Sequence, residues 1–289
     1  MTEGMSTCVY RITTESETLY LRVLPEEDAS LVPEAALHGE LRARGIKAPA
    51  VIHVEPYNET LQRSIMATSE IKGQPLSQST ELGREKLEEI VREAGRDLAM
   101  INSVPVAGFG WIQRDPQVGH DLRAQWSGQR AFALEYWDAD LAFLAQYGML
   151  SQTETAMLAQ LLRRYDAYLN AEQGYIAHGD FDSTHIYQLG GHYSGIIDFG
   201  EIRGAHQWYD LAHFHLREGE RLPLDLQTPL LQGYDSVKAL PADYQQRICF
   251  DSILINIRIL SRSLQKRPPS WYTQHQLEIL RRDLHFMLS

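Results

Sequence analysis

Hydrophobic and polar positions follow different periods in the two parts of the chain. Over residues 1–72, short runs rich in β-branched and aromatic side chains predict strands, because these side chains pack well on a pleated sheet. The runs cover residues 8–13, 18–24, 51–54 and 64–68. Residues 33–43 open with a proline and are followed by Gly45, which predicts one short helix. The first part is therefore predicted to be a small sheet crossed by one helix.

Helical spacing dominates the rest of the chain. Residues 69–76 carry the Gly and Pro of a connector, so we predict two domains, residues 1–72 and 73–289. From Leu87 to Ile101, apolar residues recur at helical spacing, which predicts a helix with one buried face. Further helices are predicted at residues 131–147, 154–169, 209–217, 243–264 and 274–287. Strands in this part are predicted only within residues 175–201.

The composition is that of a globular protein with a negative net charge. The 289 residues, 44% of them hydrophobic, are enough for one bilobal unit or two domains. A net charge of −11 argues against nucleic-acid binding. It can make the protein soluble or attract a cationic substrate, and both interpretations are open. We expect a cytoplasmic protein outside the membrane, since the chain has only two cysteines, no signal-peptide pattern and no long apolar run. A monomer and a homodimer are both open.

The first candidate for chemistry is the stretch from residue 175 to 201. Gly190-Gly191 predicts a two-residue hairpin turn in which Leu189 faces His192. In that register His185 lies opposite Ile196 and is a diagonal neighbour of Asp198, at about 7–8 Å between backbones. Their side chains can then converge on one metal ion. A loop carboxylate that lies five residues before His185, Asp180, is well placed to accept a proton from an attacking hydroxyl.

A structural interpretation of the same residues is also available. Asp180 alone can cap a turn and Asp198 alone can end a strand, both routine uses of aspartate. A zinc site around His206, His213 and His215 is not favoured, because residues two apart face different sides of a helix. The joint occurrence of the two carboxylates with the hairpin favours a metal-and-phosphate site.

Three motifs then make the chain recognisable. In order they are His178-Gly179-Asp180 with His185 four residues further on, Ile196-Ile197-Asp198-Phe199-Gly200, and Tyr209-Asp210-Leu211-Ala212. They resemble motifs of the aminoglycoside phosphotransferase and choline kinase superfamily. The resemblance implies an α+β, bilobal protein-kinase-like fold, with a small N-terminal β-sheet lobe containing one helix and a larger, mainly helical C-terminal lobe. It also implies that Asp180 is catalytic, that Asp198 and His185 hold a metal, and that Asp210 braces the catalytic loop.

The first 72 residues resemble the family more loosely. The segment around Ser6 looks like the nucleotide-covering loop, although little of the family's first strand precedes it. Arg22 stands where protein kinases use a phosphate-binding lysine, and its planar guanidinium can still pair with Glu34 and bridge phosphates. Ser69 and Ile71 fall where the hinge offers backbone hydrogen bonds to the nucleotide base.

His185 departs from the family, which usually has asparagine at this position. Magnesium prefers oxygen ligands, so an imidazole implies weaker metal binding, tolerance of manganese, or a single-metal site held mainly by Asp198. The pattern is similar to kinases that act on the 2″-hydroxyl of aminoglycosides and to macrolide kinases, which also carry His there. The substitution therefore does not argue for an inactive enzyme.

The function that these patterns favour is a small-molecule kinase. It would use ATP or GTP with Mg²⁺, or Mn²⁺, and phosphorylate a hydroxyl of a small, cationic acceptor such as an aminoglycoside. Carboxylates suited to a polycation near the expected cleft are Asp182, Glu201, Glu218 and Asp251. Tryptophans suited to a choline-like cation or a macrolide are Trp126, Trp137, Trp208 and Trp271. Both an antibiotic-resistance kinase and a housekeeping amino-sugar kinase fit.

Two other classes of function are considered. The first is a catalytically silent nucleotide-binding pseudokinase, in which His185 and Arg22 have abolished turnover; intact Asp180 and Asp198 count against it. The second is a metal hydrolase that works without a nucleotide and adds His178 to the ligands. A kinase gains thermal stability from nucleotide, whereas such a hydrolase does not.

Overall fold

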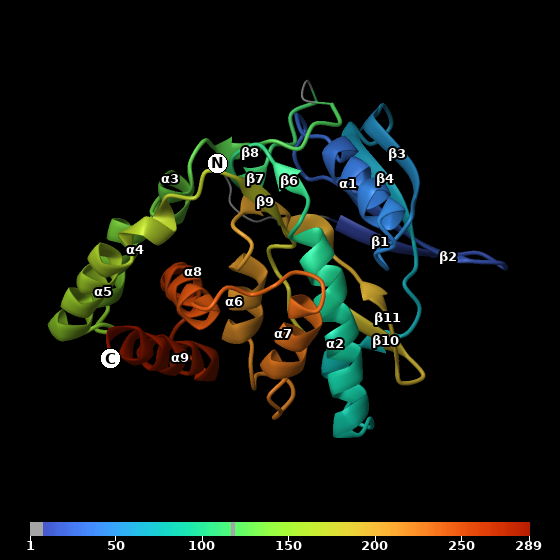
Figure 1. The fold of residues 1–289 in the computed structure, drawn as a ribbon. Coiled ribbons are helices and arrows are strands. Elements are labelled where there is room, and N and C mark those ends of the chain that lie inside the picture. Colours follow the sequence, from blue (N-terminus) through green and yellow to red (C-terminus); the bar gives the residue numbers. More distant parts are fainter. Residues whose placement is uncertain (1–7, 117–118) are drawn as a thin grey trace.

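The N-terminal elements form an antiparallel sheet with a helix on one face (Figure 1). The computed structural model describes residues 8–116 and 119–289, so the prediction for Ser6 lies outside the described residues. The sheet has the order β1-β2-β4-β3. Its elements are β1 (Cys8–Thr13), β2 (Thr18–Val23), α1 (Val32–Ala43), β3 (Val51–Asn58) and β4 (Arg63–Ser69). Every strand and the helix predicted in this part are confirmed.

The remainder of the chain is mainly helical. Its α-helices are α2 (Arg84–Ile101), α3 (Gln129–Ala133), α4 (Trp137–Gln146), α5 (Gln152–Arg164), α6 (Tyr209–Leu216), α7 (Gln227–Asp235), α8 (Tyr244–Lys266) and α9 (Trp271–Leu288). Short 3₁₀ turns are η1 (Leu76–Gln78), η2 (Asp166–Leu169) and η3 (Phe199–Glu201). The predicted α+β fold, with a small sheet part and a larger helical part, is thereby confirmed.

Two predicted helices are interrupted. The segment 131–147 contains α3 and α4 separated by a turn at residues 134–136, where the guanidinium of Arg258 lies 3.7 Å from the ring centroid of Tyr136. The segment 154–169 contains α5, which begins with a Ser151–Glu154 capping box, and then η2. Neither interruption contains a glycine or a proline, so the sequence gives no sign of it. The helices are interrupted there because tertiary contacts override local propensity.

Several elements of this part were missed. α7 has Pro229 in its first turn, where the missing N–H would have no helical partner, so proline does not prevent the helix. A five-stranded sheet has the order β6-β9-β12-β7-β8. Its strands are β6 (Pro105–Val106), β7 (Phe109–Ile112), β8 (Ala124–Trp126), β9 (Gly174–Ala177) and β12 (Arg203–Ala205). The prediction that strands are confined to residues 175–201 was wrong, because strands of two to four residues are too short to show alternation.

A third sheet links the connector to the predicted hairpin. β5 (Gln74–Pro75) pairs with β10 (Ile186–Leu189), which pairs with β11 (His192–Ile196) around Gly190-Gly191. One apolar cluster then joins α1, α2 and the hairpin, through residues such as Leu37, Ile90 and Ile196. The division into domains at residue 72 stays a prediction. None of the helices within the described residues is long and apolar enough to cross a membrane.

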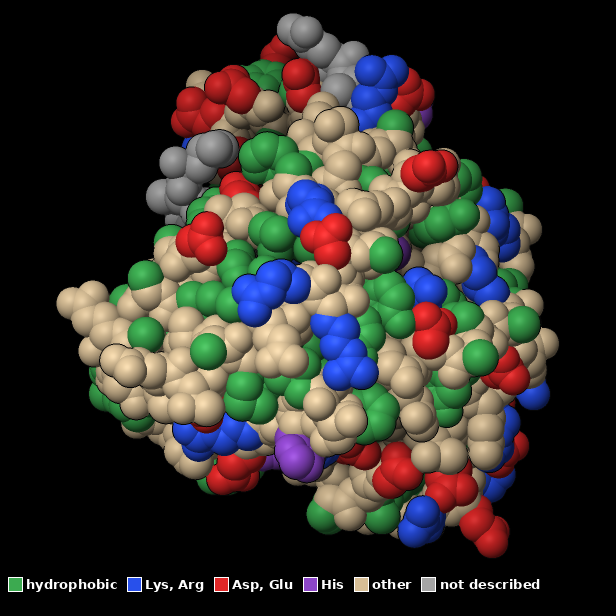
Figure 2. Space-filling view, turned by 60° about the vertical axis from the view of Figure 1, so that its left-hand side comes forward, with side chains coloured by type: hydrophobic (Ala, Val, Ile, Leu, Met, Phe, Trp, Pro, Cys, Tyr) green, Lys and Arg blue, Asp and Glu red, His purple; other side chains and the backbone are tan. Residues whose placement is uncertain are grey.

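Charges of both signs are mixed on the face shown in Figure 2. Lys and Arg lie among Asp and Glu there, with hydrophobic side chains between them. The net charge of −11 is therefore not gathered into one acidic field on this face.

Candidate active site

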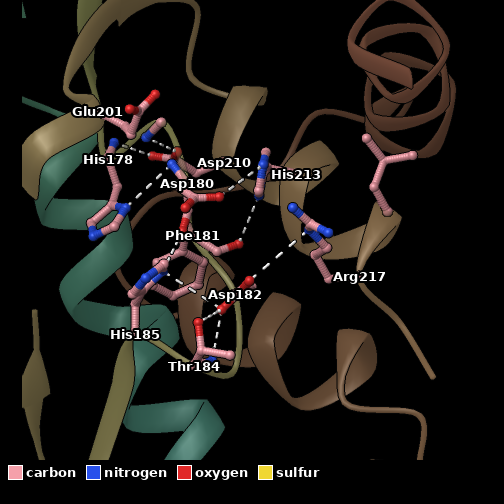
Figure 3. A network of polar contacts seen from close by, with 12 residues as sticks. His178, Asp180, Phe181, Asp182, Thr184, His185, Glu201, Asp210, His213 and Arg217 are labelled. Atoms are coloured by element: carbon pink, nitrogen blue, oxygen red, sulfur yellow. Dashed lines mark hydrogen bonds and ion pairs between the residues drawn. The ribbon is translucent and has the colours of Figure 1, made fainter. Parts of the chain in front are cut away.

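A buried carboxylate holds the loop between β9 and β10 through hydrogen bonds to its backbone. Asp210, in the first turn of α6, accepts hydrogen bonds from the backbone N–H of His178 at 2.8 Å and of Gly179 at 2.9 Å. It also accepts one from Asn102 Nδ2, at the end of α2, at 2.8 Å. Figure 3 shows Asp210 next to His178 and Asp180. Because Asp210 is fully buried, these bonds hold the loop backbone in one conformation.

Gly179 allows the loop to pass close to the chain that follows the hairpin. Its φ is +89°, and an added Cβ would lie 1.9 Å from the carbonyl oxygen of Glu201. Only glycine satisfies both demands. The turn at Gly179 directs the next side chain, that of Asp180, toward α6 (Figure 3).

Asp180 is partly exposed and lies beside basic groups. Its Oδ1 is 3.3 Å from His213 Nε2, and 37% of its side chain is exposed. Burial raises the pKa of Asp180, but the positive charges that His213, His185 and Arg217 carry when protonated outweigh burial, and the net effect lowers the pKa. The carboxylate is therefore ionised at neutral pH and able to accept a proton.

His213 was not predicted to belong to the site. Its Nδ1 lies 3.2 Å from the carbonyl oxygen of Phe181 and must donate to it, which leaves the Nε2 lone pair facing Asp180. His213 Nε2 and Asp180 Oδ1 are both acceptors, and a proton shared between them stabilises the pair. Burial has the opposite effect, because it disfavours the charged ring, and lowers the pKa of His213 to about 4. The pair is thus suited to hold a proton that arrives at Asp180.

His185 is oriented as a metal ligand would be. Its Nδ1 lies 2.6 Å from the carbonyl oxygen of Asp180 and donates to it, so the neutral ring presents a lone pair at Nε2. That atom is 3.7 Å from Asp198 Oδ2. A ring N–H anchored on a carbonyl, with the other nitrogen free to ligate, is the usual arrangement around bound metals. The two residues therefore fit a divalent cation.

The proximity of His185 to Asp198 arises differently from the prediction. Leu189 pairs with His192 as expected, but a bulge at Ser194 shifts the register, and Ile196 pairs with Ile186. His185 consequently faces Ile197, whose N–H donates to its carbonyl at 3.0 Å. Asp198 then adopts a left-handed backbone with φ of +65°. The predicted register was therefore wrong by one residue, although the two side chains do lie side by side.

Arg22 and Glu34 form the buried ion pair that the resemblance implies. Arg22 Nη1 donates to Glu34 Oε1 between β2 and α1. Burial lowers the pKa of Arg22 to about 10, although the negative charge of Asp198 raises it in part. The guanidinium is therefore still protonated at neutral pH. The pair therefore places a fixed guanidinium near the carboxylate of Asp198.

A second arginine in this region was missed. Arg114 Nη2 lies 3.6 Å from Glu34 Oε2 and donates to the carbonyl of Gly200 at 2.8 Å. Arg114 follows β7, far from Glu34 in sequence, so no local pattern could indicate it. It ties α1 to the segment just after Asp198.

The predicted hinge residues lie at the end of β4 and just after it. Ser69 exchanges hydrogen bonds with Ala50, through its backbone N–H at 2.8 Å and its Oγ at 2.9 Å. The Ile71 side chain lies against Gly195 of the hairpin, 3.2 Å from where a Cβ would stand. Their contact with the nucleotide base stays a prediction.

The four acidic candidates lie in different surroundings. Asp182 is buried and accepts hydrogen bonds from the backbone and hydroxyl of Thr184. Asp251 is buried and lies 3.0 Å from His206 Nε2. Glu218 lies 3.9 Å from Arg282, and Glu201 lies 3.1 Å from Arg203. Asp182 belongs to the loop between β9 and β10, and the backbone of Glu201 lies against Gly179 of the same loop.

His178 has a structural position. Its buried ring donates from Nε2 to the carbonyl of Ile197 at 2.9 Å, and its Nδ1 accepts from the backbone of Asp180 at 3.4 Å. With both nitrogens engaged, His178 is not available as a ligand. The geometry therefore does not support the metal-hydrolase alternative, which needs it.

Comparisons with known proteins identify the family and the fold. The model of the "Phosphotransferase enzyme family" matches residues 2–247. A solved structure of a thermostable mutant of aminoglycoside phosphotransferase APH(4)-Ia, apo form, has a TM-score of 0.66 at 16% identity, over 98% of this chain and 93% of that chain. A ternary complex of such a mutant with AMP-PNP and hygromycin B has a TM-score of 0.67 at 15% identity, over 97% and 92%.

A third solved structure is the GDP and kanamycin complex of APH(2")-IIia, with a TM-score of 0.64 at 13% identity, over 99% of this chain and 92% of that chain. At such identities the likeness concerns the fold. No curated protein matches the chain. Since the family model covers most of its 289 residues, the chain belongs to the phosphotransferase enzyme family and is an enzyme that transfers a phosphoryl group to a hydroxyl.

Proposed function

We propose that this phosphotransferase is a kinase that moves the γ-phosphoryl group of ATP or GTP to a hydroxyl of a small, cationic acceptor. The observation that carries the proposal is the placing of Asp180, an ionised carboxylate on a braced loop, next to the His185–Asp198 pair. Asp180 and His185 lie in one loop, and Asp198 follows β11 beside it, so a base and a metal-binding pair are adjacent, as transfer to a hydroxyl requires.

Each residue has a separate task. Asp180 orients the acceptor hydroxyl and accepts its proton, with His213 as the neighbour that holds the proton afterwards. Arg22, fixed by Glu34, binds phosphate oxygens through a planar guanidinium. Asp198 and His185 would hold Mg²⁺ or Mn²⁺, which would neutralise charge on the phosphates. Asp210 keeps the loop in position and does not touch the substrates.

The acceptor is proposed to be an amino sugar of the aminoglycoside kind. The neighbouring structures named above hold hygromycin B and kanamycin. Glu201 supports a polycation here, because its carboxylate is 46% exposed and its backbone touches Gly179, next to the base. We place the enzyme in the cytoplasm, where nucleoside triphosphates occur; its two cysteines are both free.

A panel assay tests the proposal. The full chain is incubated with ATP or GTP, with Mg²⁺ or Mn²⁺, and with aminoglycosides, macrolides, choline and amino sugars, and products are detected by mass shift. We expect transfer to an amino sugar, loss of transfer in Asp180→Asn, and retention of nucleotide-induced thermal stabilisation in that variant. Asp121→Asn, on a carboxylate that pairs with Arg123 at the surface, is the matched control and should behave as the unaltered protein.

The results separate the alternatives. Nucleotide binding without transfer under either metal, to any acceptor on the panel, would favour the pseudokinase and overturn the proposal. Transfer to a macrolide or to choline would keep the kinase and correct the acceptor. Transfer that survives in Asp180→Asn would show that another group is the base.

A further inference from the structure

Three potential metal ligands meet on the side of α6 that faces away from Asp180. His213 and His215 are two residues apart on this helix, so they point about 200° apart at 100° per residue. Whereas His213 lies against Asp180, His215 lies near Cys249 of α8 and Asp283 of α9. One ligand atom from each of these three residues lies within 4.8 Å of the other two.

The three side chains have the chemistry of a zinc site. Thiolate sulfur, imidazole nitrogen and carboxylate oxygen are ligands of Zn²⁺, whereas Mg²⁺ and Ca²⁺ avoid sulfur. Cys249 and Asp283 are buried and 14% of the His215 side chain is exposed, so water competes little for a bound ion. Three protein ligands leave a fourth tetrahedral position for water or another donor.

The distances are close to those of a formed site. His215 Nε2 lies 3.0 Å from Asp283 Oδ1. Two ligands that are each about 2.0–2.1 Å from a tetrahedral zinc lie about 3.4 Å apart. Cys249 Sγ lies within 4.8 Å of both atoms, against the roughly 3.6 Å that separates a sulfur from a nitrogen or oxygen ligand around tetrahedral zinc. Asp283 is already oriented by Ser252, whose hydroxyl donates to Oδ2 at 2.6 Å.

A cation already lies beside two of the three residues. His215 Nε2 and Asp283 Oδ1 both face the guanidinium of Arg282, whose Nη2 is 2.8 Å from the former and whose Nε is 3.4 Å from the latter. Arg282 can only donate to Nε2 and Asp283 can only accept from it, so metal binding requires the ring proton to lie on Nδ1, which leaves the Nε2 lone pair for the ion. The Arg282 side chain is 53% exposed and lies 3.9 Å from Glu218, toward which it can turn. A metal ion would replace the guanidinium.

We propose that His215, Cys249 and Asp283 form a binding site for a zinc-class divalent transition metal, distinct from the His185–Asp198 pair. The site joins α6, α8 and α9. Burial raises the pKa of Cys249 to about 12, so without metal the thiol is neutral and binding displaces its proton to solvent. Because α6 also carries Asp210 and His213, a bound ion would fix the helix that supports the catalytic loop.

Cobalt spectroscopy on the full chain tests the site. Co²⁺ replaces Zn²⁺ in such sites, and a cobalt–thiolate bond gives a near-ultraviolet charge-transfer band that nitrogen and oxygen ligands do not give. We expect the band to saturate at one equivalent of Co²⁺ and to disappear on addition of Zn²⁺. The chain has only two cysteines, so Cys8→Ser is the matched control and should keep the band, whereas Cys249→Ser should lose it.

A second variant keeps the thiol and guards against misfolding of Cys249→Ser. His215→Gln removes one ligand without touching the sulfur and should weaken Co²⁺ binding by tenfold or more. Absence of the band in the unaltered protein, its loss in Cys8→Ser, or unchanged affinity in His215→Gln would each overturn the proposal. None of these measurements uses phosphate transfer, so the metal site and the kinase can fail independently.

Discussion

Replacing Asp210 should lower stability and activity together. In Asp210→Ala, the backbone N–H groups of His178 and Gly179 lose their acceptor at a fully buried position. Each buried N–H left unpaired costs about 1–3 kcal/mol, so the free energy of unfolding should fall by about 2–6 kcal/mol. The Asn102 amide also loses its bond to Asp210, but keeps one to the carbonyl of Ile176 at 2.9 Å.

Asp210→Asn should have a smaller effect. Its one oxygen can still accept from His178 and Asn102, while its new amide group meets the N–H of Gly179. One unpaired donor corresponds to about 1–3 kcal/mol. Urea unfolding measures both variants, and kcat for phosphate transfer should fall in the same order because the loop that carries Asp180 loosens.

Asp97→Ala provides the control. Asp97 is also buried and accepts two hydrogen bonds, from the N–H of Lys47 at 3.0 Å and the hydroxyl of Tyr193 at 2.7 Å, but it does not contact the catalytic loop. Asp97→Ala leaves two donors without their acceptor, as Asp210→Ala does, and should lower stability comparably while kcat stays near that of the unaltered enzyme. A stability loss under 0.5 kcal/mol in Asp210→Ala, or a kcat loss in Asp97→Ala as large as in Asp210→Ala, would refute the bracing role.

The remaining predictions concern the catalytic loop. Gly179→Ala should lower the free energy of unfolding in urea by more than about 2 kcal/mol and abolish transfer. The added Cβ would lie 1.9 Å from the carbonyl oxygen of Glu201, and the backbone φ is +89°. An unchanged unfolding curve would contradict this prediction. His185→Asn should raise activity with Mg²⁺ relative to Mn²⁺ severalfold, since it restores an oxygen ligand; an unchanged ratio would remove His185 from the metal site. Burial raises the pKa of Asp180 and His213 lowers it, with a net lowering, so the base stays ionised below the usual carboxyl range. In His213→Gln the acid limb of the pH profile of kcat/KM should therefore move to higher pH, and an unmoved limb would disprove the coupling.

Local patterns were sufficient for elements that carry their own signal. The strands around Arg22 and the helix that carries Glu34 could be predicted because each is a run of the correct period between turn residues. The three loop motifs were recognisable because their residues are close in sequence. His185 and Asp198 were brought together correctly because a hairpin is also local.

Contacts between distant segments could not be predicted. His213 reaches Asp180 and Arg114 reaches Glu34 only through the packing of separate elements, and neither pair has a sequence spacing that identifies it. Asp251 was proposed for the acceptor cleft on charge alone; it lies buried against His206, and its contact with an acceptor stays a prediction. A charge in a sequence does not reveal its burial, because burial depends on which helices meet there.

The bulge in β11 takes up one residue without changing which residues pair beyond it. Ser194 is the extra residue that separates the Gly190-Gly191 tip from the end that carries Asp198. Deletion of Ser194 would leave Gly195 opposite Tyr187 and keep Asp198 on its present face, while the bend and the extra twist that a bulge gives a strand would be lost. Insertions at the tip extend both strands beyond the bulge, so we expect related sequences to differ in length there without moving Asp198. The hairpin can thus change in length at its tip and at the bulge while the end that carries Asp198 keeps its pairing.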